Sequence, residues 1–204
     1  MAYRRTEAVE QRLDNTRSAI LRAARAVVAE EGFGGATQAK VAARAGVATG
    51  TLYKHFPSKD ALGVALYQKL GEREMGLTQE AATHTAPADQ LFREAIDTFV
   101  TRAFAAPGVA RAMMAEPVGE ALARERLKAR ERHAAIYQQI IERGVAEGIF
   151  PAQDAALAAE CTAGAIVAIV AERLLHTPET HHIPALISGL QTYCLAAISG
   201  ARGM

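Results

Sequence analysis

The polar residues that could do chemistry are concentrated between Glu31 and Asp60 of this 204-residue chain. No acidic residue lies between these two, but four cationic residues do: Lys40, Arg44, Lys54 and Lys59. Lys and Arg side chains bind phosphate oxygens, and Thr, Tyr and His side chains add hydrogen bonds to phosphates or base edges. Residues 1–60 contain 10 Lys and Arg against 6 Asp and Glu, whereas residues 61–204 contain 13 against 16. These residue types favour binding of a phosphate backbone by the N-terminal part of the chain.

The elements that would position these side chains are two short helices joined by a glycine. Val41 and Ala45 give the first helix a small apolar face, and Gly46 supplies the turn. Leu52 resumes the apolar pattern, and Pro57 ends the second helix because proline disfavours helical backbone in the residue before it. This arrangement is typical of a helix-turn-helix, whose second helix enters the DNA major groove by its N-terminal end.

The same region resembles a known family. The segment AARAGVATGTLYKHFPSKDAL, preceded by TRSAILRAARAVVAEEGF, resembles the N-terminal signature of the TetR family of bacterial transcriptional repressors. The resemblance covers roughly the first third of the chain and includes the Gly-Thr-Leu-Tyr-x-His-Phe core. It implies an all-α homodimer in which residues 1–56 form a helix-turn-helix DNA-binding domain. Residues 57–204 would then form a ligand-binding and dimerisation domain.

Several residues of the first domain are candidates for contact with the DNA backbone. We expect Thr37 to cap its helix and to offer a phosphate its hydroxyl and the N–H groups of the helix end. The resemblance implies that Tyr53 and His55 contact phosphates, although packing on the first helix is the alternative. Lys54 and Lys59 are expected phosphate ligands, although an exposed lysine is often only solvated.

The first turn of the second short helix is expected to face the bases. Thr49 and Thr51 can contact a thymine methyl or a base edge, and Gly50 permits close approach. Ala48 stands where many family members carry a capping serine, so this helix lacks a side-chain cap. The expected DNA-binding residues are Thr37, Lys40, Arg44, Thr49, Gly50, Thr51, Tyr53, Lys54, His55 and Lys59. Arg4, Arg5 and Arg12 form a basic arm that either reaches the minor groove or has no function, and we leave it out of the site.

Composition predicts the rest of the architecture. Half of the residues are hydrophobic and only 5% are aromatic, and the Ala-rich segments favour helices. We predict an all-α chain of about nine helices. The first is expected to begin near Asn15 or Thr16 and to end at Gly32. The last three are expected over residues 119–147, 153–176 and 183–199.

The sequence also indicates where the protein works. The longest apolar run, residues 163–171, is flanked by Glu160 and Glu172 and is shorter than the ~18 residues that a membrane span needs. The N-terminus has no apolar signal-peptide region. Cys161 and Cys194 lack metal-type spacing and are expected to be buried in a reducing cytosol. We therefore expect a cytoplasmic protein that does not bind membranes.

The resemblance implies a ligand cavity among the fourth to seventh helices. The large residues in that region that would line it are Phe92, Phe99, Phe104, Met113, Met114 and Tyr137. Each of them could instead simply fill the core. An uncharged or amphipathic small molecule is the favoured inducer. Glu116, Arg102 and His133 could anchor a polar group, although surface positions or ordinary ion pairs are the alternative.

Small residues in the eighth helix predict a close helix contact across a twofold axis, to which the ninth helix would contribute. The expected interface residues are Ala159, Ala163, Gly164, Ala168, Leu190 and Tyr193. A buried helix of the subunit's own core would have a similar composition. Gly63, Gly71 and Gly76 would make the fourth helix compliant, so we expect it to transmit the ligand signal.

These features predict a sequence-specific transcriptional regulator, a repressor released from a palindromic operator by a small, largely apolar ligand. The alternatives are an activator, or a helical small-molecule-binding protein without a DNA role. We expect no enzyme activity, because nucleophile elbows, phosphate loops and paired catalytic carboxylates do not appear in the sequence. We expect no cofactor and no metal, since His176, His181 and His182 would need a fourth ligand and a fixed geometry.

Overall fold

Three helices form the N-terminal domain of the computed structural model, which describes residues 7–176 and 183–200. They are α1 (Glu7–Gly35), α2 (Gln38–Ala45) and α3 (Thr49–His55). The hydroxyl of Thr37 accepts a hydrogen bond from the backbone N–H of Lys40 at 3.3 Å and caps α2. Gly46 ends α2 with φ 66°, a left-handed conformation that glycine adopts without strain. As expected, Ala48 gives α3 no side-chain cap.

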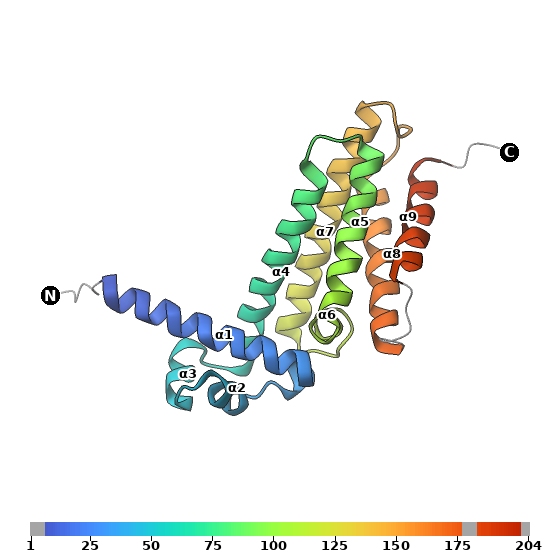
Figure 1. Cartoon of the computed structure of the whole chain (residues 1–204). Helices are drawn as coiled ribbons and strands as arrows, with labels where there is room; N and C mark the ends of the chain where they lie inside the picture. Colours follow the sequence, from blue (N-terminus) through green and yellow to red (C-terminus); the bar gives the residue numbers. More distant parts are fainter. Residues whose placement is uncertain (1–6, 177–182, 201–204) are drawn as a thin grey trace.

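Six further helices form the rest of the described chain (Figure 1). They are α4 (Lys59–Thr83), α5 (Ala88–Ala105), α6 (Pro107–Met114), α7 (Glu120–Ala146), α8 (Ala155–His176) and α9 (Ile183–Ile198). In Figure 1, α1 lies across the base of a bundle in which α4, α5 and α7 stand side by side. Short α6 packs against α1, and α8 and α9 cover the side of the bundle away from α4. The described residues are thus all-α with nine helices, as the sequence predicts.

Two hydrophobic cores hold these helices together. The first joins α1 to α3 through Ile20, Leu52 and Phe56, each at most 1% exposed, and it extends into α4 through Leu66. It also takes in Val109 and Ala112 of α6 and Leu122 of α7. The packing is therefore continuous across residue 56, where we expect the domain boundary. The second core is built from α5, α7, α8 and α9, with residues such as Phe92, Ile140, Ile166 and Cys194.

The expected start of α1 is wrong. The helix begins at Glu7, eight residues before Asn15. Both expected capping residues are satisfied inside the helix, because Asn15 accepts a hydrogen bond from Gln11 and the Thr16 hydroxyl donates to the carbonyl of Arg12 at 2.9 Å. At the other end, Gly32 breaks the regular backbone with φ 72°, although the helix resumes to Gly35.

One described helix, α8, is long and apolar enough to cross a membrane by length and composition. Our expectation considered only the uninterrupted apolar run and did not single this helix out. One face of α8 packs on the second core through Ala159, Ile166 and Val170. The opposite face is largely exposed and includes Leu157, which is 58% exposed. A core helix of a soluble protein passes the same test of length and composition, so the test is weak evidence for a membrane span.

Candidate DNA-binding surface and ligand cavity

Buried residues of α3 fix its orientation and turn its N-terminal end outward. Leu52 is fully buried, and Phe56 directly after the helix is 1% exposed. The guanidinium of Arg17 lies 4.4 Å from the centre of the Phe56 ring and donates to the carbonyl of His55 at 3.4 Å. Gln38 donates to the carbonyl of Phe56 at 2.8 Å. These contacts hold the C-terminal end of α3 against α1 and α2.

The outward surface of α3 carries most of its expected DNA contacts. Thr49, Gly50, Tyr53 and Lys54 are exposed, and Thr51 and His55 are half-buried. No atom lies within 4 Å of the position that a Cβ of Gly50 would occupy, so the fold itself does not require glycine there. Thr37 lies exposed at the start of α2. The expected DNA contacts of α3 and Thr37 are thus at least partly accessible to solvent, and their contact with DNA stays a prediction.

Acidic residues of α1 lie closer to the expected cations than the sequence suggests. Both oxygens of the Glu30 carboxylate accept hydrogen bonds from Arg44, at 2.6 Å each. This pairing holds the pKa of the exposed Glu30 carboxyl below its usual range. Glu31 forms an ion pair with Lys40 through one of its carboxylate oxygens. Residues 32–59, which include no acidic residue, therefore lie adjacent in space to the carboxylates of Glu30 and Glu31. Sequence spacing could not show this.

Two lysines differ in their surroundings. Lys59 donates to the carbonyl of Gly34 at 2.7 Å, so it already joins α4 to the end of α1. The exposed side chain of Lys54 makes no hydrogen bond or ion pair with any residue that the structure describes. Lys54 is therefore the more available phosphate ligand of the two.

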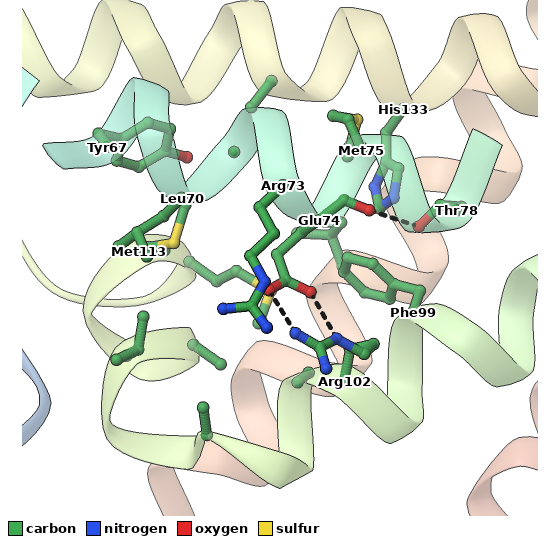
Figure 2. A pocket seen from close by; sticks show the side chains of 18 of the residues that line it. Tyr67, Leu70, Arg73, Glu74, Met75, Thr78, Phe99, Arg102, Met113 and His133 are labelled. Atoms are coloured by element: carbon green, nitrogen blue, oxygen red, sulfur yellow. Dashed lines mark hydrogen bonds and ion pairs between the residues drawn. The ribbon is translucent and has the colours of Figure 1, made fainter. Parts of the chain in front are cut away.

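A cavity of about 480 Å³ lies where α4, α5, α6 and α7 meet, and Arg25 of α1 and Val167 of α8 also reach it. Of the six residues expected to line it, Phe99, Met113 and Met114 do so. Sequence reasoning missed a part of the wall that α4 supplies, which includes Tyr67, Leu70, Gly71, Met75 and Thr78 (Figure 2). The helical spacing of those α4 residues carried the signal, but an apolar stripe equally indicates core packing.

The other three expected residues lie in or against the core and are not part of the cavity wall. An aromatic row leads inward from the cavity: the Phe99 and His133 rings are 4.4 Å apart, and His133 and Tyr137 are 6.1 Å apart. Phe92 continues this row at 5.4 Å from Tyr137, and both are fully buried. Phe104 is partly buried against the same core. The cavity wall includes His133, whereas Tyr137 and Phe92 lie further along the row and fill the core.

The cavity wall combines apolar residues with an excess of positive charge. Five arginines contribute to it: Arg25, Arg73, Arg102, Arg126 and Arg130. Glu74 is the one acidic residue of the described wall, and it accepts two hydrogen bonds from Arg102 at 2.9 and 2.8 Å (Figure 2). Of the three expected polar anchors, Arg102 and His133 line the cavity, whereas Glu116 bonds to the end of α1 instead. The wall can therefore hold a ligand that has both apolar and anionic parts.

Burial shifts the pKa of two groups near the inner end of the cavity. His133 is 3% exposed, and burial lowers its pKa to about 4, so its imidazole is neutral at pH 7. Burial raises the pKa of the Tyr137 hydroxyl, which stays protonated. Neither His133 Nε2 nor the Tyr137 hydroxyl has a hydrogen-bond partner among the described residues. His133 thus adds a neutral polar side chain to the cavity wall.

Half of the expected interface residues are buried within the subunit. Ala159, Ala163 and Leu190 are at most 6% exposed and pack in the second core. Gly164 is half-buried, Ala168 is exposed, and Tyr193 is 67% exposed. Small size alone could not separate the inward face of α8 from its outward face. The expected burial of Cys161 is wrong, since its side chain is exposed on that outward face, whereas Cys194 is buried.

The expectations about histidines and the basic arm lie partly outside the described residues, because the structure does not describe His181, His182, Arg4 or Arg5. Across residues 7–176 and 183–200, there is no group of three or more His, Cys, Asp and Glu that could hold a metal ion.

Comparison with known proteins agrees with this geometry. Residues 20–66 match the sequence model of a family described as bacterial regulatory proteins, tetR family. No curated protein matches the chain by sequence. Among solved structures, the transcriptional regulator FadR from Bacillus subtilis, in complex with stearoyl-CoA, has a TM-score of 0.79 at 21% identity, covering 89% of this chain and 98% of that one. A putative TetR-family regulator from Mesorhizobium loti has a TM-score of 0.76 at 18% identity, with coverages of 93% and 99%. GusR from Salmonella enterica has a TM-score of 0.74 at 23% identity, with coverages of 96% and 98%.

Proposed function

We propose that this chain, whose residues 20–66 match the tetR family of bacterial regulatory proteins, is a homodimeric repressor that leaves a palindromic operator when a small ligand occupies its cavity. The observation that carries the proposal is the exposed N-terminal turn of α3, held outward by buried Leu52 and Phe56. In this proposal the protein is cytoplasmic, where it meets DNA, and it is not an enzyme.

At the operator, Thr49, Gly50 and Thr51 face the base edges, and Tyr53, Lys54 and His55 contact phosphates. Thr37 adds a phosphate contact at the start of α2. Lys40, Arg44 and Lys59 reach DNA only by exchanging their present partners, Glu31, Glu30 and the Gly34 carbonyl, for phosphate or base atoms. Base contacts of Thr49, Gly50 and Thr51 set the sequence preference, and phosphate contacts supply much of the affinity.

The dimer forms through the outward faces of α8 and α9. Residues at spacings of three, four and seven on α8 are exposed or half-buried and are apolar or small: Leu157, Cys161, Gly164, Ala168 and Leu175. On α9, the exposed residues include Ala185, Gly189, Tyr193 and Ala196. Small side chains let helices of two subunits approach closely, and an exposed apolar face of this length needs cover in water. A second copy of the chain supplies that cover in the proposed dimer.

The ligand is an amphipathic molecule whose apolar part lies against Leu70, Phe99, Met113 and neighbouring residues, with an acidic group near the arginines. The cavity volume of about 480 Å³ lies within the range of sites for small molecules. FadR from Bacillus subtilis, which shares the fold, was solved with stearoyl-CoA, a molecule that combines an acyl chain with phosphates. We therefore propose the fatty acyl thioesters as the ligand class to test first.

Selection from a random pool of double-stranded DNA tests the proposed function. We expect the purified protein to enrich a palindrome whose half-sites lie about one helical turn, ~34 Å, apart, because each subunit presents one α3. The Thr49→Ala variant should enrich an altered sequence, and Lys69→Ala, an exposed change on α4, should enrich the original one. Failure to enrich any sequence would contradict the proposal.

A further inference from the structure

The turn between α6 and α7 is attached to the end of α1 through the carboxylate of Glu116. One of its oxygens accepts a hydrogen bond from the N–H of Phe33 at 2.8 Å, and the other accepts one from the N–H of Gly34 at 2.7 Å. Successive backbone N–H groups of this kind form a concavity that binds anions. A Cβ on Gly32, where φ is 72°, would lie 2.4 Å from the carboxylate. The end of α1 is therefore shaped to receive this side chain.

The same turn is held from the other side by Arg126 of α7. Its guanidinium donates to the carbonyls of Met113 at 2.8 Å, Ala112 at 3.3 Å and Glu116 at 2.9 Å. Ala112 and Met113 are in the last turn of α6, where carbonyls lack partners within the helix and a cation is favourable. Arg126 thus fixes both the end of α6 and the backbone of the residue whose carboxylate binds α1.

Arg126 is also part of the cavity wall, together with Arg25, Arg73 and Arg130. One side chain therefore contacts both the ligand cavity and the turn that is anchored to the DNA-binding domain. Helix α6 adds a second contact with α1, since a Cβ on Gly108 would lie 2.0 Å from the carbonyl oxygen of Ala29. One path from the cavity to α1 therefore runs through the short helix α6 and the turn that follows it.

We infer that Arg126 and Glu116 form a two-residue link through which the ligand controls the position of the DNA-binding domain. The inference rests on the proposed function and adds the residues that couple its two sites. An acidic ligand group would compete with three neutral carbonyls for Arg126, because it can accept two parallel charge-assisted hydrogen bonds from one guanidinium. Once Arg126 moves, the turn loosens, Glu116 leaves the N–H groups of Phe33 and Gly34, and α1 is free to tilt. Arg126 is thus a positioning residue, because it acts on α1 through Glu116.

A double-mutant cycle with Glu116→Ala and Arg126→Ala tests the link without any ligand. We expect each variant to lower operator affinity by about five- to hundredfold, the usual range of coupling between sites. The double variant should bind the operator at least as tightly as the weaker-binding single variant, because both changes break the same link. The matched controls are Glu120→Ala and Arg124→Ala, which remove an exposed ion pair near the start of the same helix, and these should leave affinity unchanged. Additive losses in the cycle would overturn the inference.

Hydrogen–deuterium exchange separates this link from a merely structural role. Arg126→Ala should speed exchange of the Phe33 and Gly34 amides, although Arg126 has no hydrogen bond to α1, and Arg126→Lys should restore part of the protection. Unchanged exchange at these amides in a folded Arg126→Ala dimer would refute the link.

Stearoyl-CoA added to the wild-type protein should speed exchange at the same amides. If it binds and lowers operator affinity but leaves these amides protected, the link is wrong and the proposed function stands. If neither operator nor stearoyl-CoA binds, the proposed function fails, while the exchange in Arg126→Ala still decides the link.

Discussion

Individual residues differ in how well their roles could be predicted from sequence. The exposed positions of Thr49 and Lys54 followed from the spacing of buried Leu52 and Phe56, because Thr49, Leu52 and Lys54 share one short helix and Phe56 directly follows it. The pairing of Arg44 with Glu30 could not be predicted in this way, since the two residues lie 14 positions apart on different helices. The link between Glu116 and the amides of residues 33 and 34 spans more than 80 positions and has no local sequence signal.

Lys54 provides a test of the DNA surface at the scale of one residue. Lys54→Ala should weaken binding to all DNA sequences and make the dependence of affinity on salt shallower, by about one unit of the log–log slope for each phosphate that the protein no longer neutralises. The physical reason is that fewer counterions leave the DNA when one phosphate has no cationic partner. Fluorescence anisotropy at several salt concentrations measures the slope, with exposed Lys69→Ala as the charge-matched control. An unchanged slope for Lys54→Ala would remove this residue from the contact surface.

His133 gives the protein a predictable dependence of stability on pH. Burial lowers the pKa of the folded protein's imidazole to about 4, below its ordinary value of 6.5. Between these values the unfolded chain binds a proton that the folded chain does not, so stability falls as pH decreases from about 6.5 to 4, by up to about 3 kcal/mol. Urea unfolding should show that His133→Leu loses less stability than the wild-type protein as the pH falls over this range. The exposed His84 serves as the control, and equal pH dependence in His133→Leu and His84→Leu would contradict this account.

At the scale of elements, turn and cap residues identified most helix ends well. Thr37 and Gly46 lie where the sequence places them, because each acts on backbone groups within a few residues. Asn15 and Thr16 misled the prediction of α1, since polar side chains can bond within a helix as well as cap it. The glycines of α4 also differ: a Cβ on Gly63 would lie 3.1 Å from Leu122, whereas Gly76 has open space. The role of α4 as a compliant helix stays a prediction.

The uncapped start of α3 predicts a stabilising substitution. Ala48→Ser places a hydroxyl beside the free N–H groups of the first turn, and a cap of this type contributes about 1 kcal/mol. Ala43→Ser is the matched control, because Ala43 is exposed inside α2, where serine lowers helix propensity by roughly 0.5 kcal/mol. The free energy of unfolding, measured with heat or urea, should therefore rise for Ala48→Ser and fall for Ala43→Ser. Destabilisation by Ala48→Ser would show that the serine hydroxyl does not cap the N–H groups of the first turn of α3.

At the scale of the whole molecule, the proposed dimer depends on which face of α8 is free. Ala163 is unsuitable for a test because it is buried in its own subunit, so an arginine there would disturb folding itself. A Cβ on Gly164 meets no atom within 4 Å, so Gly164→Arg is tolerated by the subunit and places charge and bulk in the proposed interface. Light scattering should report monomers for Gly164→Arg and dimers for Gly76→Arg, an equally open glycine on α4. A folded Gly164→Arg dimer with normal operator affinity would place the interface elsewhere.

The central claim is that occupancy of the cavity controls DNA binding. The most direct measurement is the affinity of the dimer for its selected operator, by fluorescence anisotropy, with increasing stearoyl-CoA and with octadecanol as a probe lacking acidic groups. The account predicts a fall in affinity of about five- to hundredfold with stearoyl-CoA, and little change with octadecanol, because the arginine-rich wall binds the acidic part. Operator affinity that stays constant while stearoyl-CoA occupies the cavity would contradict the account.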